Sequence, residues 1–194
     1  MVAFTVAILA GGKSSRMGRD KAFVELNGKL MIEHVIERTQ SIGQAETILI
    51  TNHPENYARF GLPMFTDVLP DKGSLGGIYT AIHYSTQAYT LCVACDMPFI
   101  QPDLLKHMVS LAQDWDVVVP LVDEYPEGLH ALYSRKCLDA IHPRLLAGKL
   151  KVIGFYADVR VRYLKETEYT SFDPDAVSFR NINTPDDLAD ASHQ

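Results

Sequence analysis

The chain has 194 residues, a formal net charge of −6 at pH 7 and a hydrophobic fraction of 47%. This length and composition predict one globular domain, residues 1–194, with an ordinary core. The acidic balance excludes a general nucleic-acid binder, which needs a basic face, but permits a small anionic ligand at a local basic loop. No apolar stretch approaches the roughly 18 residues of a membrane span. We therefore expect neither nucleic acid nor a membrane as a partner.

The amino terminus and the cysteines predict a cytoplasmic protein. The first residues lack the basic start of a secretory signal, and their apolar run stops at Gly11. The cysteines number three, and an odd count without a signal fits a reducing compartment. Cys92 and Cys95 form a C-x-x-C pattern inside an apolar run, and no second ligand pair follows. We expect buried, small hydrophobic side chains here rather than a redox or zinc pair.

Apolar strands and amphipathic helices alternate along the chain. Continuous β-branched runs predict buried strands, and apolar residues spaced three to four apart predict helices. In chain order the pattern predicts a strand at 4–9, a helix at 31–40, strands at 47–51 and 64–67, a helix at 76–84, a strand at 89–94, a helix at 104–111, strands at 116–122 and 132–134, and a helix at 137–146. The segments 152–156 and 161–164 fit either a helix or a strand.

The last predicted element is a helix that begins after Thr184 and ends near Ser192. Threonine suits the cap, proline the first helical position and acids the first turn, and Thr184 is followed by proline and two aspartates. Strands that alternate with helices imply crossover connections and a parallel sheet covered on both faces. The predicted fold class is therefore α/β, a single-domain three-layer α/β/α sandwich around a mainly parallel, Rossmann-like sheet.

Residues 9–21, with the sequence LAGGKSSRMGRDK, follow the first predicted strand. A Walker A loop is excluded because position 7 is alanine, and the dinucleotide fingerprint is excluded because Lys13 follows the second glycine. The small residues at the start still let backbone approach a ligand, and ligands bind at this end of a parallel strand. Arg16 offers a planar fork for phosphate oxygens and Lys21 a point charge. The loop therefore predicts a phosphate site, with an ordinary solvated basic loop as the alternative.

Polar side chains follow several other predicted strands. Asp96 comes just after the fourth strand, where a carboxylate can bind Mg²⁺ together with water and phosphate oxygens. Asp67 ends the third strand. Asn181 and Asn183 flank Ile182, so in an extended segment the two amides share one face and Ile182 points inward. They could bind an acceptor or complete a metal shell. The alternative for each of these residues is a plain turn or cap.

Four motifs in order along the chain resemble one enzyme family. They are L-A-G-G-x-x-x-R-M-G-x-D-K at 9–21, F-T-D before a glycine loop at 73–77, A-C-D-M-P-F at 94–99 and F-R-N-I-N-T-P at 179–185. Together they resemble the bacterial molybdenum cofactor guanylyltransferases, the MobA family of nucleotidyltransferases, over nearly the whole chain. One departure concerns nucleotide or acceptor preference: the family usually has G-P-L-A-G where this chain has G-S-L-G-G at 73–77.

The resemblance implies GTP as the nucleotide and Mg²⁺ as the cofactor. The residues implied to bind GTP are Leu9, Ala10, Gly11, Lys21, Asp67 and Asp96. The first three would form the edge that meets the base. Arg16 and Lys21 would face the triphosphate and Asp96 would bind Mg²⁺, and these three form the implied catalytic set. Asn181 and Asn183 are assigned to the acceptor side. Weaker candidates are Asn52 for the ribose and His130 and Arg135 for the acceptor.

The implied reaction is the transfer of GMP to the terminal phosphate of molybdopterin carrying molybdenum. An acceptor oxygen attacks the α-phosphorus of GTP and pyrophosphate leaves, which gives the guanine dinucleotide form of the cofactor. Other proteins of molybdenum cofactor biosynthesis are further candidate partners. One alternative is a related transferase that uses CTP or a sugar or alcohol phosphate. Another is a non-catalytic nucleotide-binding protein on the same fold, although the presence of both Lys21 and Asp96 favours an enzyme.

Overall fold

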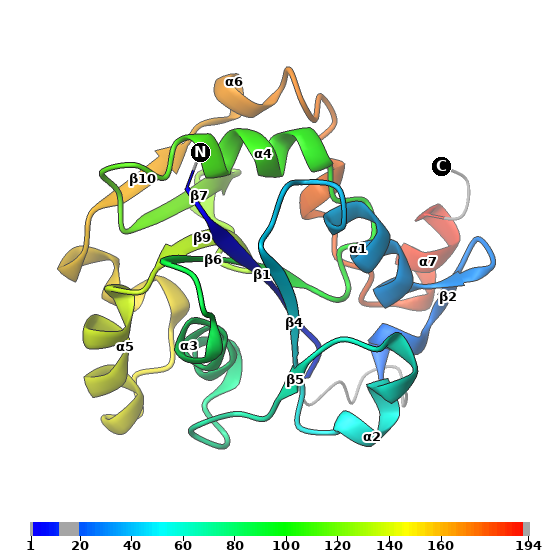
Figure 1. The fold of residues 1–194 in the computed structure, drawn as a ribbon. Coiled ribbons are helices and arrows are strands. Elements are labelled where there is room, and N and C mark those ends of the chain that lie inside the picture. Colours follow the sequence, from blue (N-terminus) through cyan, green and yellow to red (C-terminus); the bar gives the residue numbers. More distant parts are fainter. Residues whose placement is uncertain (1, 12–19, 192–194) are drawn as a thin grey trace.

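A mainly parallel β-sheet runs through the centre of the protein (Figure 1). A computed structural model describes residues 2–11 and 20–191. The sheet has the strand order β10-β7-β9-β6-β1-β4-β5, with β8 paired to β7. Its strands are β1 (Phe4–Leu9), β4 (Glu46–Ile50), β5 (Met64–Phe65), β6 (Tyr89–Ala94), β7 (Val117–Val122), β8 (Tyr125–Pro126), β9 (His130–Ser134) and β10 (Val161–Leu164). Strand β9 runs antiparallel to both β6 and β7, and β8 is antiparallel to β7, whereas the remaining pairs are parallel.

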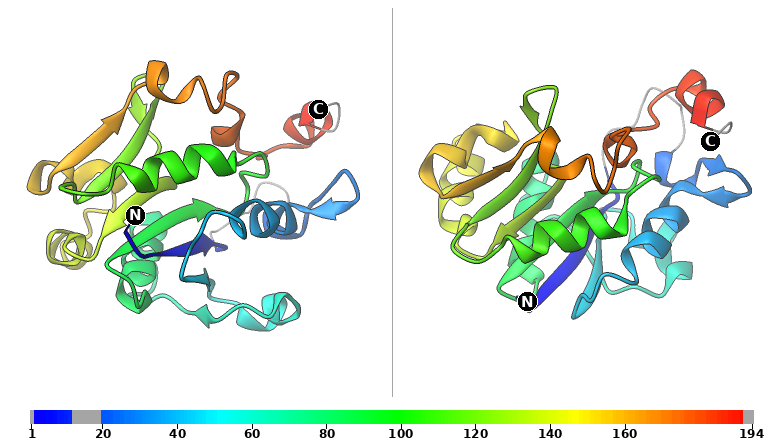
Figure 2. Two further views of the ribbon diagram at one scale, coloured as in Figure 1. Left: turned by 45° about the horizontal axis from the view of Figure 1, so that its top comes forward. Right: turned by 90° about the horizontal axis from the view of Figure 1, so that it is seen from above.

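Helices cover both faces of the sheet, as the two further views show (Figure 2). Helices α1 and α4 pack on one face, and α3 and α5 pack on the other. The α-helices are α1 (Met31–Thr39), α2 (Pro54–Tyr57), α3 (Gly73–Tyr84), α4 (Pro102–Ser110), α5 (Cys137–Leu146), α6 (Glu166–Tyr169) and α7 (Pro185–Ala191). Short 3-10 helices are η1 (Lys21–Phe23), η2 (Ala58–Phe60), η3 (Val152–Asp158) and η4 (Val177–Phe179). The predicted three-layer α/β/α class is therefore confirmed.

Strand β1 shows why the sheet is buried on both faces. Its side chains alternate, so Phe4, Val6 and Ile8 contact the layer of α1 and α4. Ala7 and Leu9 contact the layer of α3 and α5. A central parallel strand is covered on both sides, so its sequence is apolar throughout rather than alternating with polar residues. That continuous apolar run is the signal that identified the strand.

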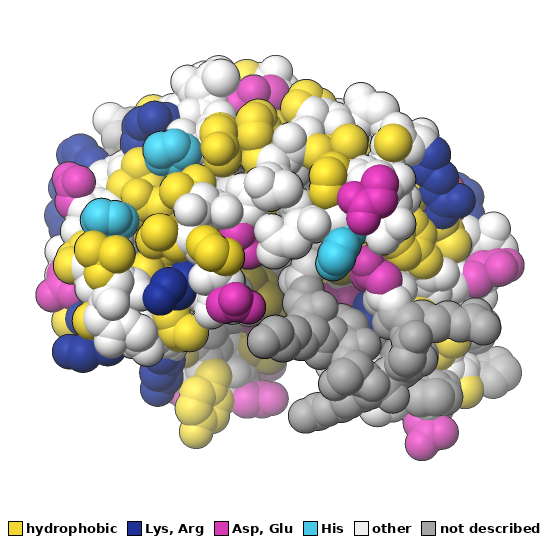
Figure 3. Space-filling model, turned by 90° about the horizontal axis from the view of Figure 1, so that it is seen from below, with side chains coloured by type: hydrophobic (Ala, Val, Ile, Leu, Met, Phe, Trp, Pro, Cys, Tyr) yellow, Lys and Arg dark blue, Asp and Glu magenta, His cyan; other side chains and the backbone are white. Residues whose placement is uncertain are grey.

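The outer surface of α3 and α5 carries hydrophobic and histidine side chains (Figure 3), several of which stack on one another. The ring of Tyr79 stacks on His83 and on His142, with centroid separations of 6.1 and 5.7 Å. Phe65 stacks on Tyr84 with centroids 4.2 Å apart. These contacts bridge the two helices and the end of β5, so they tie this layer to the edge of the sheet.

A smaller apolar cluster joins the two ends of the chain beside the main core. Strands β2 (Glu25–Leu26) and β3 (Lys29–Leu30) form an antiparallel hairpin. Leu26 of the hairpin packs with Met31, Ile182 and Ala191, which is in α7. Figure 1 shows α7 beside β2. The cluster therefore brings the segment that carries Asn183 close to the part of the chain that follows β1.

Most predicted elements are confirmed with small shifts of their ends. Helix α3 begins at Gly73 rather than at residue 76, so the predicted glycine loop forms its first turn, and Gly73 has φ of +58°. The predicted cap of the last helix is confirmed, because the Asp187 amide donates to Thr184 Oγ1 at 3.1 Å. The two ambiguous segments become η3 and β10. The β2–β3 hairpin was not predicted, although Asn27 and Gly28, both with positive φ, are a typical hairpin turn pair.

The cysteines are free and buried, as predicted: Cys92, Cys95 and Cys137. Burial raises the pKa of each thiol, that of Cys137 to about 12, so none is a ready nucleophile. Within residues 2–11 and 20–191, no helix combines the length and the apolar character needed to cross a membrane.

Candidate active site

The backbone of residues 9–11 lies at the carboxyl edge of the sheet, between two neighbouring strands. The Ala10 amide donates to the Ile50 carbonyl at 2.9 Å, and the Leu9 carbonyl accepts from the Cys95 amide at 3.2 Å. Ala10 is fully buried and Gly11 is exposed. Among residues 2–11 and 20–191, a Cβ on Gly11 would approach only the Cα of Thr51, at 4.0 Å. Packing against these residues therefore does not require glycine here, which fits close approach of a ligand from outside.

Three predicted site residues meet at this edge: Lys21, Asp96 and Asn183. The Lys21 ammonium donates to Asp96 Oδ2 at 3.2 Å and also to Asn183 Oδ1. The Lys21 and Asp96 side chains are each 17% exposed. The three residues come from the start of η1, the turn after β6 and the segment before α7, so only the fold brings them together. Arg16, the other predicted cation, lies outside the described residues.

The segment that carries Asn181 and Asn183 is held by backbone hydrogen bonds. The Ile182 amide donates to the Asp96 carbonyl at 3.0 Å, and the Ile182 side chain is fully buried, as predicted. One oxygen of Asp187 accepts from the amides of Asn183 and Thr184, both at 2.8 Å. These bonds hold the pKa of Asp187 below its usual value. The segment is thus held at Ile182, between the two asparagines, and at Asn183 and Thr184, with the Asn183 side chain on Lys21.

A second polar pair lies on the other side of β1. Asn52 follows β4 and Asp67 follows β5. The Asn52 side-chain amide donates to Asp67 Oδ2 at 2.9 Å, and the Asp67 backbone amide donates back to Asn52 Oδ1 at 3.0 Å. This pair therefore faces the same edge as Asp96 but is separated from it by β1.

Two weaker candidates do not join the site. His130 is fully buried with its ring edge-on to Phe179 at 5.0 Å between centroids. Arg135 donates to the Ser85 carbonyl at 2.7 Å. Because β9 is antiparallel to β6, the end of β9 lies at the opposite edge of the sheet from Asp96. The structure therefore does not bring Arg135 to the edge that carries Asp96.

The sequence analysis also missed residues that support the site. Asp20 caps η1 by accepting from the Ala22 amide at 3.2 Å, and its other oxygen accepts from the Tyr57 hydroxyl at 2.5 Å. Burial, followed by the bond to Asp20, raises the pKa of Tyr57. Asp20 thus fixes the turn that carries Lys21. An aspartate directly before Lys21 was visible as a possible cap, but Tyr57 comes from a distant helix and has no local signal.

The donor set at Asp96 fits magnesium better than a transition metal. Among the described residues, no three histidine, cysteine, aspartate or glutamate side chains form a metal-binding group. Mg²⁺ needs only one or two carboxylates, because water and phosphate oxygens supply its remaining ligands. Asp96 offers such a carboxylate, half-buried and held beside a cation.

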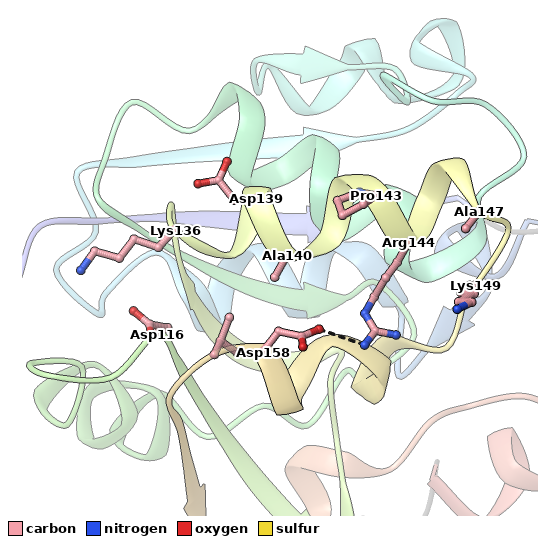
Figure 4. Close-up of a pocket in the computed structure, with 10 residues that line it drawn as sticks. Asp116, Lys136, Asp139, Ala140, Pro143, Arg144, Ala147, Lys149 and Asp158 are labelled. Atoms are coloured by element: carbon pink, nitrogen blue, oxygen red, sulfur yellow. Dashed lines mark hydrogen bonds and ion pairs between the residues drawn. The ribbon is translucent and has the colours of Figure 1, made fainter.

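A pocket of about 620 Å³ lies away from this edge, against α5 (Figure 4). None of the predicted site residues that the structure describes lines it. Three of its charged residues form ion pairs: Arg144 points to Asp158, 2.9 Å away, and Asp116 pairs with Arg160 at 3.1 Å. The pocket therefore does not displace the carboxyl edge as the candidate site.

The family model of the MobA-like NTP transferase domain matches residues 6–159. The chain belongs to this family. A probable molybdenum cofactor guanylyltransferase of Pelotomaculum thermopropionicum is 40% identical over 191 residues, which cover 98% of this chain and 93% of the relative. The molybdenum cofactor guanylyltransferase of Desulfosudis oleivorans is 37% identical and covers 98% of this chain and 95% of its own length.

A solved structure agrees with the family assignment. Molybdopterin-guanine dinucleotide biosynthesis protein A from Archaeoglobus fulgidus superposes with a TM-score of 0.85 at 32% identity, over 97% of each chain. The family match ends at residue 159 and so includes Lys21, Asp67 and Asp96 but not the asparagine pair. The two relatives and this structure extend the similarity over nearly the whole chain, including the segment before α7.

Proposed function

We propose that this member of the MobA-like family transfers GMP from GTP to the terminal phosphate of molybdopterin carrying molybdenum. The observation that carries the proposal is the contact of Lys21 with both Asp96 and Asn183, beside the open backbone of residues 9–11. A cation, a carboxylate and an amide converge where ligands of parallel sheets bind. The names of the near full-length relatives support the choice of nucleotide and acceptor.

The nucleotide lies along the β5-β4-β1 part of the carboxyl edge in this proposal. The guanine base packs on Leu9, Ala10 and Gly11, whose backbone groups can match its donors and acceptors. Asn52 and Asp67, linked to each other, lie on that side and bind the ribose. Lys21 lies on the other side of β1, where it meets the triphosphate, and Arg16 adds a second positive charge.

Asp96 is the residue that would hold Mg²⁺. When bound, the ion neutralises negative charge on the phosphate oxygens. The protein's own contribution is position and charge: Lys21 places an ammonium group beside the phosphates, and Asn183 orients that group. An acceptor oxygen attacks the α-phosphorus, the bond to pyrophosphate breaks, and no covalent enzyme intermediate is needed. Catalysis then consists of alignment and electrostatic stabilisation of the charge that develops.

The test is incubation of the protein with molybdenum-loaded molybdopterin, Mg²⁺ and each of the four nucleoside triphosphates in turn. We expect release of pyrophosphate and a guanine dinucleotide with GTP, and loss of both when a chelator removes Mg²⁺. A cytidine dinucleotide in preference to the guanine product would assign the chain to CTP instead. Pyrophosphate release with a sugar or alcohol phosphate alone would reassign the acceptor. Absence of any transfer would leave a nucleotide-binding protein.

We also propose a cytoplasmic location, because the cysteines are buried and form no disulfide.

A further inference from the structure

Glu127 lies near the end of β6, the strand that Asp96 follows, although it is 31 positions from Asp96 in the sequence. Strands β6 and β9 pair antiparallel with Val93 opposite His130. The Ala94 amide then donates to the Leu129 carbonyl at 3.0 Å, which continues the pairing beyond β9. Beyond this bond the chain turns, because the His130 amide donates to the Glu127 carbonyl at 3.1 Å, and the Glu127 amide donates to the Pro120 carbonyl of β7 at 3.0 Å. Glu127 Oε1 accepts from the Leu129 amide within this turn, so its carboxylate lies beside the end of β6, at the carboxyl edge that also carries Asp96.

The Glu127 carboxylate is half-buried and has little local compensation. Its Oε1 accepts from the Leu129 amide at 3.0 Å. Burial raises its pKa, the Leu129 amide opposes this, and the charge of Asp96 raises it further. Among the described residues, no lysine or arginine forms an ion pair with Glu127. Partial removal of a charged carboxylate from water costs free energy when no cation pairs with it. Hydrogen-bond donors from a ligand would reduce that cost.

The strand order separates Glu127 from the proposed base site. Residues 9–11 end β1, Asp96 follows β6, and Glu127 lies next to β9. Neighbouring strands are about 4.8 Å apart, so β9 is roughly 10 Å from β1. The Asn52 and Asp67 pair lies on the opposite side of β1. A nucleotide that occupies β5, β4 and β1 and brings its phosphates to Asp96 leaves the Glu127 side for the acceptor.

We propose that Glu127 binds the pyrimidine edge of the acceptor's pterin and so selects the acceptor. This inference rests on the function proposed above. The phosphate and the dithiolene of the acceptor are anionic and would be repelled by a carboxylate. The 2-amino-4-oxopyrimidine edge is different, because N3–H and the 2-amino group are adjacent donors. Two parallel donors match the two oxygens of a carboxylate, the pairing that makes such contacts strong and specific.

The experiment compares 6-hydroxymethylpterin with 6-hydroxymethyllumazine, in which oxygen replaces the 2-amino group. Binding of each is measured by fluorescence titration and by competition with molybdopterin. We expect the wild-type protein to prefer the pterin by roughly tenfold or more, since a site built for a donor rejects an analogue that lacks it. Glu127→Gln should bring this ratio close to one and raise KM for molybdopterin by a similar factor, with kcat at saturating acceptor and GTP affinity retained.

Glu124→Gln is the matched control, because Glu124 is an exposed acid in the adjacent β7–β8 turn and the charge change is the same. Glu127→Asp, which keeps the charge but shortens its reach, should give an intermediate ratio and serves if the glutamine variant does not fold. A Glu127→Gln protein that keeps the wild-type ratio and KM overturns the inference. If wild type forms no dinucleotide yet loses its pterin preference on this substitution, the proposed reaction fails while the role of Glu127 stands.

Discussion

Replacing His130 with leucine should make the stability of the protein less sensitive to mild acid. His130 is fully buried, and neither ring nitrogen has a hydrogen-bond partner among the described residues. Burial lowers its pKa from 6.5 to about 3, so the folded protein keeps the ring neutral. In the unfolded chain the ring takes up a proton as the pH falls below 6.5. The unfolded state then binds more protons, and the free energy of unfolding decreases as the pH falls.

The size of the effect follows from these two pKa values. Between pH 7.5 and pH 5, a group with a pKa of 6.5 in the unfolded chain and about 3 in the folded protein removes about 2 kcal/mol of stability. For a chain of this length, 1 kcal/mol corresponds to about 2–4 °C in Tm, so His130 should account for about 4–8 °C of the acid-induced decrease. Leucine does not titrate, so the variant lacks this acid-induced loss of stability. It also removes two unpartnered buried nitrogens, each of which costs about 1–3 kcal/mol.

The assay is urea unfolding of wild type and His130→Leu at a series of pH values from 7.5 to 5, with Tm measured in parallel. The difference in stability between the two proteins should grow in favour of the variant as the pH falls. His53→Leu, which removes an exposed histidine, should follow the wild-type curve. A His130→Leu protein with the wild-type pH dependence would refute the reasoning, as would an NMR titration of the His130 ring with a midpoint near 6.5.

Four further outcomes are expected. Asp96→Asn should fold normally but lose most pyrophosphate release, and near-normal release at low magnesium would contradict the role of Asp96. Lys21→Ala should lower kcat/KM by about 100- to 1,000-fold. Lys29→Ala, which removes an exposed cation, should leave kcat/KM unchanged. Equal losses in the two variants would argue against a site-specific effect of Lys21. GTP should exceed ATP in kcat/KM by roughly 30-fold or more, since a mismatched base strands buried polar groups, and equal values would exclude base recognition. Asp173→Ala should lower the free energy of unfolding by about 2–6 kcal/mol in urea. The reason is that this buried carboxylate accepts hydrogen bonds from the backbone amides of Val177 and Ser178. Unchanged stability would show that those bonds contribute nothing.

The sequence predicted the elements whose signal is local. The apolar run at 4–9 and the cap at Thr184 both depend on neighbouring residues, and both are confirmed. The placement of Asp96 after a strand also follows from local order, since a polar residue at the end of an apolar run leaves the core. Short segments gave no such certainty: 152–156 and 161–164 have too few residues for a period of two to be told from a period of 3.6.

The sequence by itself determined the α/β class and, through four ordered motifs, the family. Only the tertiary structure decided which distant groups meet. Lys21 contacts Asp96 and Asn183 because the strand order and the small cluster around Ile182 close gaps of 75 and 162 residues. The antiparallel direction of β9 likewise moves Arg135 to the far edge and brings Glu127, which precedes β9, to the edge near the end of β6. Periodicity reports which face of an element is buried, but the order and direction of strands depend on packing between elements that no local pattern records.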